Sequence, residues 1–365
     1  MKVVFVSNFL NHHQKPLSDA LAARCDYTFL AVSEMPPQRR AMGWEEPEPV
    51  YLCRYDREPE RGERVLREAD VIIAGFSAEN LVRGCIQRGQ LVLRYSERPL
   101  KNGLEPWKYL PRLLRWHRRN PVGKPVYLLC AGGYVAADYR KFGLFRGKAL
   151  KWGYFPETRK YPALPEKEPG SILWAGRFLD CKHPEAALRV AAALKESGLD
   201  FRMTLIGDGP RMEAVRRILA AEKLSDRVAL PGMLTPEQVR AAMEKAEIFL
   251  FTSDGADGWG AVLNEAMNSG CAVVAGSAAG ATPYLVRSGE NGLVYPSGET
   301  AALTEAVRTL LTDRELARRL GKGAYRTITE IWNGELAAQR LLETAERILR
   351  GEGLPQYEDG PCAGA

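Results

Sequence analysis

Short runs of apolar residues alternate with segments of helical periodicity through the first 155 residues. The run 3–6, Val-Val-Phe-Val, has no polar alternation and ends at polar residues. Runs of this kind predict strands that are buried on both faces of a parallel sheet covered by helices. The predicted strands lie at 3–6, 27–32, 71–74, 91–93 and 126–129, and the predicted helices at 15–24, 78–88, 105–119 and 132–140.

A second alternating series follows a proline-rich segment. Residues 155–170 contain four prolines, several charges and little apolar content, which predicts a linker. We therefore expect an α/β protein with two parallel-sheet, Rossmann-like domains, at 1–154 and 171–332. The strands of the second domain are predicted near 171–175, 202–206, 227–230, 247–252, 271–275 and 292–295, and its helices near 184–197, 210–223, 235–246, 260–269, 299–312 and 313–326.

The chain ends in one more helix and a short polar segment. Asn333 is placed to cap a helix at 333–350, whose apolar residues recur at helical spacing. The last residues, 351–365, are rich in glycine and polar residues. We expect this tail to be disordered.

Composition narrows the class of protein. The chain has 365 residues, of which 45% are apolar and 26% charged, and this globular average excludes disorder for most of its length. No apolar run approaches the roughly 20 residues of a membrane-spanning helix, and the N-terminus has no signal-peptide pattern. The seven cysteines are widely spaced and form no C-x-x-C, which predicts free thiols rather than a disulfide framework or a zinc site. We expect a cytoplasmic protein.

Positive charge is concentrated in the first domain. The net charge is +6, but residues 1–155 carry 26 Lys and Arg against 16 Asp and Glu. This excess suggests an anionic partner for the first domain: nucleic acid, a membrane surface or an acidic substrate. The segment 101–119 has six basic residues against one Glu, with Trp, Tyr and Leu interleaved. It predicts either a helix that lies on an anionic membrane or a packed helix with a solvated basic face, and we expect no nucleic-acid partner.

The loop after the first strand is polar. It contains no G-x-G-x-x-G, which argues against a dinucleotide site, and no carboxylate or cysteine joins its histidines at metal-ligand spacing. Ligands of open α/β sheets bind at the carboxyl ends of strands, so we expect polar contacts to a hydroxylated ligand here, with a purely structural loop as the alternative. The candidate residues are Asn8, Asn11, His12 and His13, joined by Glu97 and Arg98 at the end of another predicted strand.

Two cations follow the first strand of the second domain. Gly176, Arg177 and Lys182 lie between this strand and a helix that begins at Pro184. The N-terminus of a helix carries partial positive charge and free N–H groups, so the two cations could form a phosphate clamp there. Two solvated surface cations remain the alternative. A further glycine turn, Gly207 to Gly209, follows the next strand and is an ordinary feature of such folds.

The stretch 247–275 is the most informative. A strand ends in a polar loop that carries Asp257, and Gly258-Trp259-Gly260 then opens a helix that bears Glu265. Glycines let backbone N–H groups approach a ligand closely. Asp257 is therefore expected beside a pyrophosphate or a sugar, and Glu265 farther back, where it could accept hydrogen bonds from ribose hydroxyls. Acid/base hydrolysis by the two carboxylates is the alternative, although it needs a facing pair across a substrate.

Together these motifs resemble the retaining GT-B glycosyltransferases of the large family-4 type, the glycosyl transferases group 1. The match covers residues 171–312 in order and spacing. It departs from the family at Asp257, where a Glu is usual, at Ala272, where a Pro is usual, and at residues 8–13, which replace a glycine-rich loop. The motifs that carry the resemblance are Gly176-Arg177 with Lys182, Gly207-Asp208-Gly209-Pro210, Asp257-Gly258-Trp259-Gly260 with Glu265-Ala266-Met267, Gly270 to Ala275, and Asn291 to Val294.

The resemblance implies two domains that face a cleft, with the C-terminal helix crossing back to the N-terminal domain. It implies that the donor is a nucleotide diphosphate sugar, with a UDP-sugar as the preferred choice. It implies no metal and no cofactor. Arg177 and Lys182 would neutralise the diphosphate, Glu265 would bind the ribose, and Asp257 with the amides of residues 258–260 would hold the sugar. The first domain would bind a saccharide or lipid-linked acceptor.

The implied activity is sugar transfer with retention in bacterial-type polysaccharide, exopolysaccharide or glycolipid biosynthesis. Such a transferase would be cytoplasmic, and peripheral on the inner face of the membrane if segment 101–119 contacts lipid. Two other hypotheses remain: a sugar-nucleotide epimerase on the same fold, which would need catalytic acids in the first domain, and a non-catalytic module that binds a nucleotide sugar or lipid.

Overall fold

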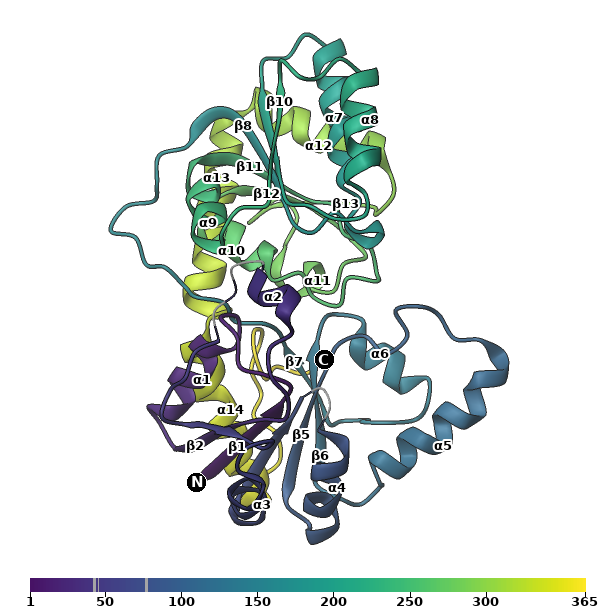
Figure 1. The fold of residues 1–365 in the computed structure, drawn as a ribbon, viewed down its shortest axis with the longest axis vertical. Helices are drawn as coiled ribbons and strands as arrows, with labels where there is room; N and C mark the ends of the chain where they lie inside the picture. Colours follow the sequence, from purple (N-terminus) through teal and green to yellow (C-terminus); the bar gives the residue numbers. More distant parts are fainter. Residues whose placement is uncertain (42–43, 45, 76–77) are drawn as a thin grey trace. The chain divides into compact units, whose positions relative to one another are not determined.

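The computed structural model describes residues 1–41, 44, 46–75 and 78–365. The chain divides into two compact units, of which unit 1 comprises Met1–Glu157 and Ile331–Ala365, and unit 2 comprises Thr158–Glu330. Each unit contains one parallel sheet with α-helices in the connections, so the predicted α/β fold class is confirmed (Figure 1).

Unit 1 contains a seven-stranded sheet in the order β3-β2-β1-β4-β5-β6-β7. The chain moves from one side of β1 to the other at β4, so the carboxyl ends of these two strands form the switch point where ligands of such sheets bind. The strands are β1 (Lys2–Ser7), β2 (Asp26–Ala31), β3 (Leu52–Arg54), β4 (Val71–Ala74), β5 (Leu91–Ser96), β6 (Val126–Ala131) and β7 (Ala149–Trp152). The helices are α1 (Lys15–Ala22), α2 (Pro37–Ala41), α3 (Pro59–Glu68), α4 (Glu79–Arg88), the 3-10 turn Pro106–Lys108, α5 (Tyr109–Arg119), α6 (Val135–Arg140) and α14 (Gly334–Leu349).

Unit 2 repeats this topology with six strands in the order β10-β9-β8-β11-β12-β13. Its switch point lies between β8 and β11, at the centre of the sheet. The strands are β8 (Glu168–Ala175), β9 (Arg202–Ile206), β10 (Val228–Gly232), β11 (Ala246–Phe251), β12 (Ala272–Gly276) and β13 (Leu293–Tyr295). The helices are the 3-10 turn Asp180–Lys182, α7 (Pro184–Glu196), α8 (Met212–Ala221), α9 (Pro236–Lys245), α10 (Val262–Asn268), α11 (Thr282–Leu285), α12 (Thr300–Thr312), α13 (Arg314–Arg326) and a π-helical turn at Thr327–Ile331.

The predicted central strands all form, and their side chains are buried as a parallel sheet requires. All four residues of β4 are buried, as are the inward-facing residues of β8 and β11 that pack in the core of unit 2. The short strands β3 and β7 and the helices α2 and α3 were not predicted. The predicted helix at 105–119 begins instead at Tyr109, after the 3-10 turn, with Pro111 tolerated in its first turn.

The last helix packs within unit 1. The side chain of Asn333 caps α14 as predicted, because its Oδ1 accepts the N–H of Leu336 at 2.9 Å. Helix α14 lies against α1 (Figure 1), and their approach is close at Gly334, where a Cβ would lie 3.2 Å from the backbone N of Leu17. A side chain at position 334 would therefore push the two helices apart.

The expected disorder of residues 351–365 is wrong. The tail forms an antiparallel bridge with the edge strand β7, in which the N–H of Cys362 donates to the Lys151 carbonyl at 2.8 Å and the N–H of Lys151 donates to the Ala363 carbonyl at 2.7 Å. Cys362 and Ala363 are about 1% exposed. The tail is ordered because it satisfies the free backbone groups of an edge strand and buries small apolar side chains.

The segment expected as a linker, 155–170, is packed rather than free. Phe155 is buried in unit 1, where its ring lies beside that of Trp332. In unit 2, Arg159 pairs with Glu244 at 2.9 Å, and Lys167 donates to the carbonyls of Met243, Glu244 and Ser269. Polar side chains of this segment therefore find fixed partners, which composition did not indicate.

All seven cysteines have free thiols, and Cys25 and Cys181 are partly exposed while the others are buried. Within the described residues, no helix combines the length and the apolar character that crossing a bilayer requires.

Candidate functional site

The carboxyl ends of β8, β9 and β11 meet at one edge of the unit 2 sheet, because these strands are parallel neighbours. Gly176 follows β8 and Gly207 follows β9, and the two turns pack directly on each other. Gly207 has φ +141°, and a Cβ on it would lie 1.9 Å from the Gly176 carbonyl oxygen. The glycine predicted at 207 is therefore required by a close backbone approach, whereas a Cβ at 176 would lie 3.4 Å from the Trp174 ring, an ordinary contact.

Lys182 and Asp257 form an ion pair at this edge. Lys182 Nζ lies 2.5 Å from Asp257 Oδ2, and the two side chains are 18% and 12% exposed. Two further contacts join their loops: Thr252 Oγ1 donates to the Lys182 carbonyl at 2.6 Å, and the N–H of Asp254 donates to the Cys181 carbonyl at 2.9 Å. The structure thus brings the predicted cation and the predicted carboxylate together.

His183 supports the same edge and was not among the predicted residues. It has a left-handed backbone, with φ 49° and ψ 54°, immediately before Pro184 opens α7. Its Nε2 lies 2.8 Å from Asp254 Oδ2. A non-glycine residue in this conformation costs on the order of 1 kcal/mol, and the bond to Asp254 helps to hold it. His183 therefore fixes the turn that carries Lys182.

Arg177 and Glu265 have different environments. The side chain of Arg177 is exposed, and its guanidinium pairs with no residue that the structure describes. Glu265 lies in the first turn of α10, slightly earlier in its helix than predicted, and is partly buried. The free guanidinium is available to an anion, and Glu265 lies near a helix N-terminus.

The glycine loop before α10 is densely packed. Gly260 has φ +93°, and a Cβ there would lie 2.3 Å from the ring of Phe251 and 2.9 Å from Asp257 Oδ2. Gly280, which sequence reasoning missed, packs tightly against the same loop. A Cβ added at this position would lie 1.8 Å from the Gly258 carbonyl oxygen. Trp259 is fully buried, and its Nε1 donates to Asn264 Oδ1 at 2.8 Å. Trp259 can therefore offer a ligand its backbone only.

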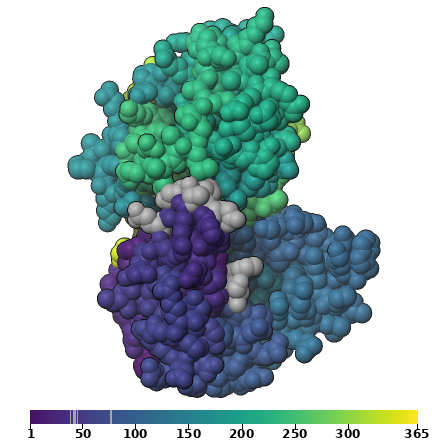
Figure 2. Space-filling view, in the orientation of Figure 1, coloured from purple at the N-terminus to yellow at the C-terminus, as the bar shows by residue number. Residues whose placement is uncertain are grey.

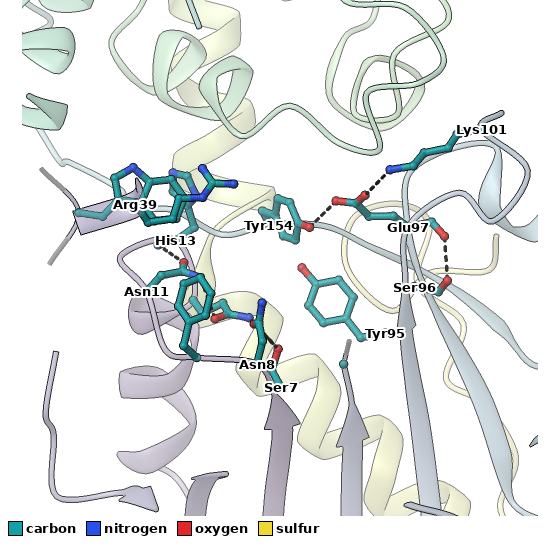
Figure 3. Close-up of a pocket in the computed structure, with 14 residues that line it drawn as sticks. Ser7, Asn8, Asn11, His13, Arg39, Tyr95, Ser96, Glu97, Lys101 and Tyr154 are labelled. Atoms are coloured by element: carbon teal, nitrogen blue, oxygen red, sulfur yellow. Dashed lines mark hydrogen bonds and ion pairs between the residues drawn. The ribbon is translucent and has the colours of Figure 1, made fainter. Parts of the chain in front are cut away.

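Unit 1 has its own cavity, of about 540 Å³, at the carboxyl ends of β1, β4 and β5 (Figure 3). The predicted residues Asn8, Asn11, His13 and Glu97 line it. Amides, hydroxyls and aromatic rings dominate the lining, a combination that suits a hydroxylated ligand. The other lining residues are Ser7, Phe9, Gln14, Arg39, Trp44, Gly75, Tyr95, Ser96, Lys101 and Tyr154.

Glu97 is held in place at one side of this cavity. Tyr154 Oη donates to Glu97 Oε1 at 2.5 Å, and Lys101 Nζ lies 3.8 Å from Oε2, as Figure 3 shows. Glu97 is the one carboxylate among the described lining residues. A single fixed carboxylate can accept hydrogen bonds from ligand hydroxyls.

The two histidines of the loop after β1 form an aromatic cluster. Their ring centroids are 4.0 Å apart, and the ring of Trp44 lies 4.5 Å from His12 and 5.4 Å from His13. Burial, helped by the positive charge of Arg39, lowers the pKa of His12 to about 4 and that of His13 to about 3. Both rings are therefore neutral near pH 7. In the described part of the chain, no group of three His, Cys, Asp or Glu residues could hold a metal ion.

Two of the predicted residues do not line the unit 1 cavity. Arg98 Nε lies 3.0 Å from the buried Asp138 Oδ2, which also accepts the N–H of Leu100 at 3.2 Å. Arg98 thus fixes the loop after β5 rather than facing the cavity. His12 contributes its ring to the aromatic cluster behind His13.

The basic helix α5 has a packed face and an exposed face. Trp116 is buried against Phe142, with ring centroids 4.4 Å apart, and His117 Nε2 lies 2.9 Å from the Phe142 carbonyl oxygen. Leu110 and Leu114 face outward and are 59% and 58% exposed, and Trp107 just before the helix is 72% exposed. The blue segment that contains α5 stands at the surface of unit 1 (Figure 2).

Comparison with known proteins identifies the C-terminal part of the chain. Residues 156–327 match the family described as glycosyl transferases group 1. The putative colanic acid biosynthesis glycosyltransferase WcaL of Escherichia coli K12 is 28% identical over 249 residues, which are 65% of this chain and 60% of that protein. The alpha-D-kanosaminyltransferase of Streptomyces kanamyceticus is 29% identical over 153 residues, 42% of this chain and 39% of that protein. The chain thus spans 60% or less of the length of these curated relatives.

Solved structures match across both units. The Anabaena protein Alr3699/HepE, solved in complex with UDP, has a TM-score of 0.72 at 15% identity, and the match covers 95% of this chain and 100% of that one. Sucrose-phosphate synthase from Thermosynechococcus elongatus has a TM-score of 0.64 at 19% identity, covering 96% and 100%. At sequence identities of 15% and 19%, the structural similarity establishes the fold alone. Residues 156–327 of the chain thus match the glycosyl transferases group 1, and its two parallel-sheet units have the GT-B fold.

Proposed function

We propose that this protein is a glycosyltransferase that moves a sugar from a nucleotide diphosphate sugar to a saccharide or lipid-linked acceptor in bacterial polysaccharide or glycolipid assembly. The observation that carries the proposal is the half-buried Lys182–Asp257 pair at the strand ends of unit 2, with the exposed Arg177 on the preceding turn. The match of this unit to the glycosyl transferases group 1 supports it.

The donor is assigned to unit 2 and is expected to be a UDP-sugar. Arg177 and Lys182 would bind the diphosphate, Glu265 the ribose hydroxyls, and Asp257 with the amides of residues 258–260 the sugar. A structural neighbour, Alr3699/HepE of Anabaena, was solved in complex with UDP-glucose, which supports this choice of donor. The leaving diphosphate gains negative charge in the transition state, and a preorganised cation beside it can contribute a few kcal/mol.

Transfer is proposed to proceed with retention and without a metal. The two cations would take the place of a metal at the leaving group. The leaving phosphate would accept the proton of the acceptor hydroxyl on the same face of the sugar, so that no separate general base is assigned.

The acceptor is assigned to the cavity of unit 1. Its amide and hydroxyl lining, with Glu97 fixed by Tyr154, suits the hydroxyls of a saccharide. An epimerase would need a pair of catalytic acids in this unit, and Glu97 is the one acid among the described residues of the cavity. This favours transfer. The names of relatives also support a role in polysaccharide assembly: colanic acid for WcaL, and amylovoran for AmsK of Erwinia amylovora.

The expected location is the inner face of the cytoplasmic membrane, which α5 would contact. The outward Leu110 and Leu114, with Trp107 nearby, stand among basic residues, a combination that suits an anionic lipid surface.

Nucleotide release from a panel of UDP-, GDP- and ADP-sugars tests the proposal, with and without saccharide or lipid extracts. The expected result is nucleotide release that depends on an acceptor and that Lys182→Ala lowers about 10²-fold or more. Interconversion of the sugar without an acceptor would point to an epimerase, and binding without turnover to a non-catalytic module. Either of these two results would overturn the proposed transfer.

A further inference from the structure

A second cavity of unit 1, of about 740 Å³, lies between α4 and α5. Four arginines line it: Arg83 from α4, and Arg115, Arg118 and Arg119 from α5. It shares none of its described lining residues with the cavity at the strand ends. Helices α4 and α5 therefore form a basic cleft that is separate from the cavity at the strand ends.

The positive charge of this cleft is only partly balanced. Among its described lining residues the one carboxylate is Glu79, which is already engaged by Arg94 at 2.9 Å and by Arg119 at 3.6 Å. Arg83, Arg115 and Arg118 are exposed and pair with no acceptor in the described part of the chain. Like charges around one cavity repel each other, and an anion bound among them relieves that repulsion. Guanidinium groups match the oxygens of a phosphate particularly well.

The same cleft has an apolar side. Leu114, Pro111 and Ile86 line it beside the arginines, and Leu114 is 58% exposed. Leu110, one helical turn earlier, continues this apolar strip outward. A ligand that matches the whole surface carries a phosphate next to hydrocarbon, as a membrane phospholipid does. The phosphate chain of a nucleic acid offers nothing apolar to Leu110 and Leu114.

We propose that the cleft between α4 and α5 binds the phosphate headgroup of an anionic membrane phospholipid and so docks unit 1 on the bilayer. This inference rests on the proposed membrane location, and it names the phospholipid phosphate as the group that unit 1 binds there. Arg83, Arg115 and Arg118 hold the phosphate, and Leu110 and Leu114 enter the acyl region. Recognition then depends on α4 as well as α5, which distinguishes a built headgroup site from the insertion of a single amphipathic helix.

Flotation with vesicles tests this, with 30% phosphatidylglycerol in phosphatidylcholine compared with phosphatidylcholine alone. The wild-type chain is expected to float with the anionic vesicles only. Arg83→Ala and Arg115→Ala should each weaken partitioning about tenfold. Arg88→Ala on α4 and Arg112→Ala on α5 remove the same charge from the same helices, but neither residue lines the cleft. These controls should weaken partitioning by no more than about fivefold, the effect of one charge near an anionic surface.

Three results would overturn the headgroup site. One is wild-type protein that does not float. Another is Arg83→Ala binding like wild type while Arg115→Ala fails, which would mean that α5 alone inserts. The third is equal losses for Arg83, Arg88, Arg112 and Arg115, which would mean diffuse attraction. Circular dichroism of each variant checks folding. Nucleotide release with a soluble saccharide acceptor separates failure of this site from failure of the proposed transfer, because that assay needs no vesicle.

Discussion

Lys182 Nζ lies 2.5 Å from Asp257 Oδ2, so the cation assigned to the diphosphate is paired with the carboxylate assigned to the sugar. Both side chains are largely removed from solvent, and loss of either partner would leave a poorly solvated charge. The pair holds the two groups in position before the donor arrives. A bound diphosphate would place further negative oxygens next to Lys182.

Removal of either cation should slow turnover. Lys182→Ala is expected to lower kcat about 10²-fold or more, because the diphosphate would leave without its buried cation, and Arg177→Ala should act in the same direction. Steady-state nucleotide release measures both effects. Lys195→Ala is a matched control, since Lys195 is paired with Asp226 on the outside of unit 2. Wild-type rates in both test variants would refute the assignment of the two cations.

Gly280→Ala should disturb the glycine loop without removing a polar group. The added Cβ would lie 1.8 Å from the Gly258 carbonyl oxygen, which belongs to the backbone and cannot rotate away. We expect a loss of stability of about 1–3 kcal/mol together with weaker donor binding. Gly84→Ala is the control, because its Cβ would meet only the flexible end of Arg88, at 3.2 Å. Equal melting temperatures for Gly280→Ala and wild type would contradict the packing described here.

The His12–His13 cluster predicts a pH dependence of stability. The unfolded chain protonates these rings near pH 6.5, whereas the folded chain does so only near pH 4 for His12 and pH 3 for His13. Between these values the unfolded state binds more protons, so the free energy of unfolding falls as the pH is lowered from about 7 to about 4. Calorimetric melting across this range measures the slope. His13→Gln should flatten it, and an unchanged slope would show that His13 titrates normally in the folded chain.

Deletion of residues 359–365 should destabilise unit 1. The deletion removes the backbone pairing with β7 and the buried Cys362 and Ala363, which exposes an edge strand. We expect the melting temperature to fall by a few degrees and aggregation to increase. Lys151→Ala removes the 2.8 Å pair with Asp359 but keeps the backbone pairing with the tail, and should cost less than about 1 kcal/mol. If the truncated protein were as stable as wild type, the pairing of the tail with β7 would contribute nothing to the stability of unit 1.

The elements that sequence predicted well are those with a strong local signal. The strand at 71–74 is apolar at every position because it is buried on both faces, and that pattern needs no knowledge of its neighbours. β7 alternates Ala, Leu, Lys and Trp over only four residues, and it lies between β6 and the tail, which is more than 200 residues away. Such pairing has no local signature, so both the strand and the order of the tail were missed.

The candidate sites divide in the same way. Gly176, Gly207 and Gly260 were predicted because they stand in local sequence motifs, and the structure requires glycine at 207 and 260, where a side chain would collide with neighbouring atoms. Tyr154 and Arg39 line the unit 1 cavity together with the loop after β1, although they lie far from it in sequence. The role of Arg98 was misjudged, because its partner, Asp138, lies on another element. These roles depend on contacts between residues that are distant in sequence, and the periodicity of a sequence carries no information on such contacts.

Nucleotide binding measured by titration calorimetry tests the central claim most directly, with UDP compared with UMP. If Lys182 and Arg177 hold the diphosphate, wild-type protein should bind UDP at least about tenfold more tightly than UMP. Lys182→Ala should lose most of that preference while still binding UMP, because the nucleoside contacts remain. A wild-type protein that binds UDP and UMP equally, or a Lys182→Ala variant that keeps the full preference, would contradict the proposed donor site.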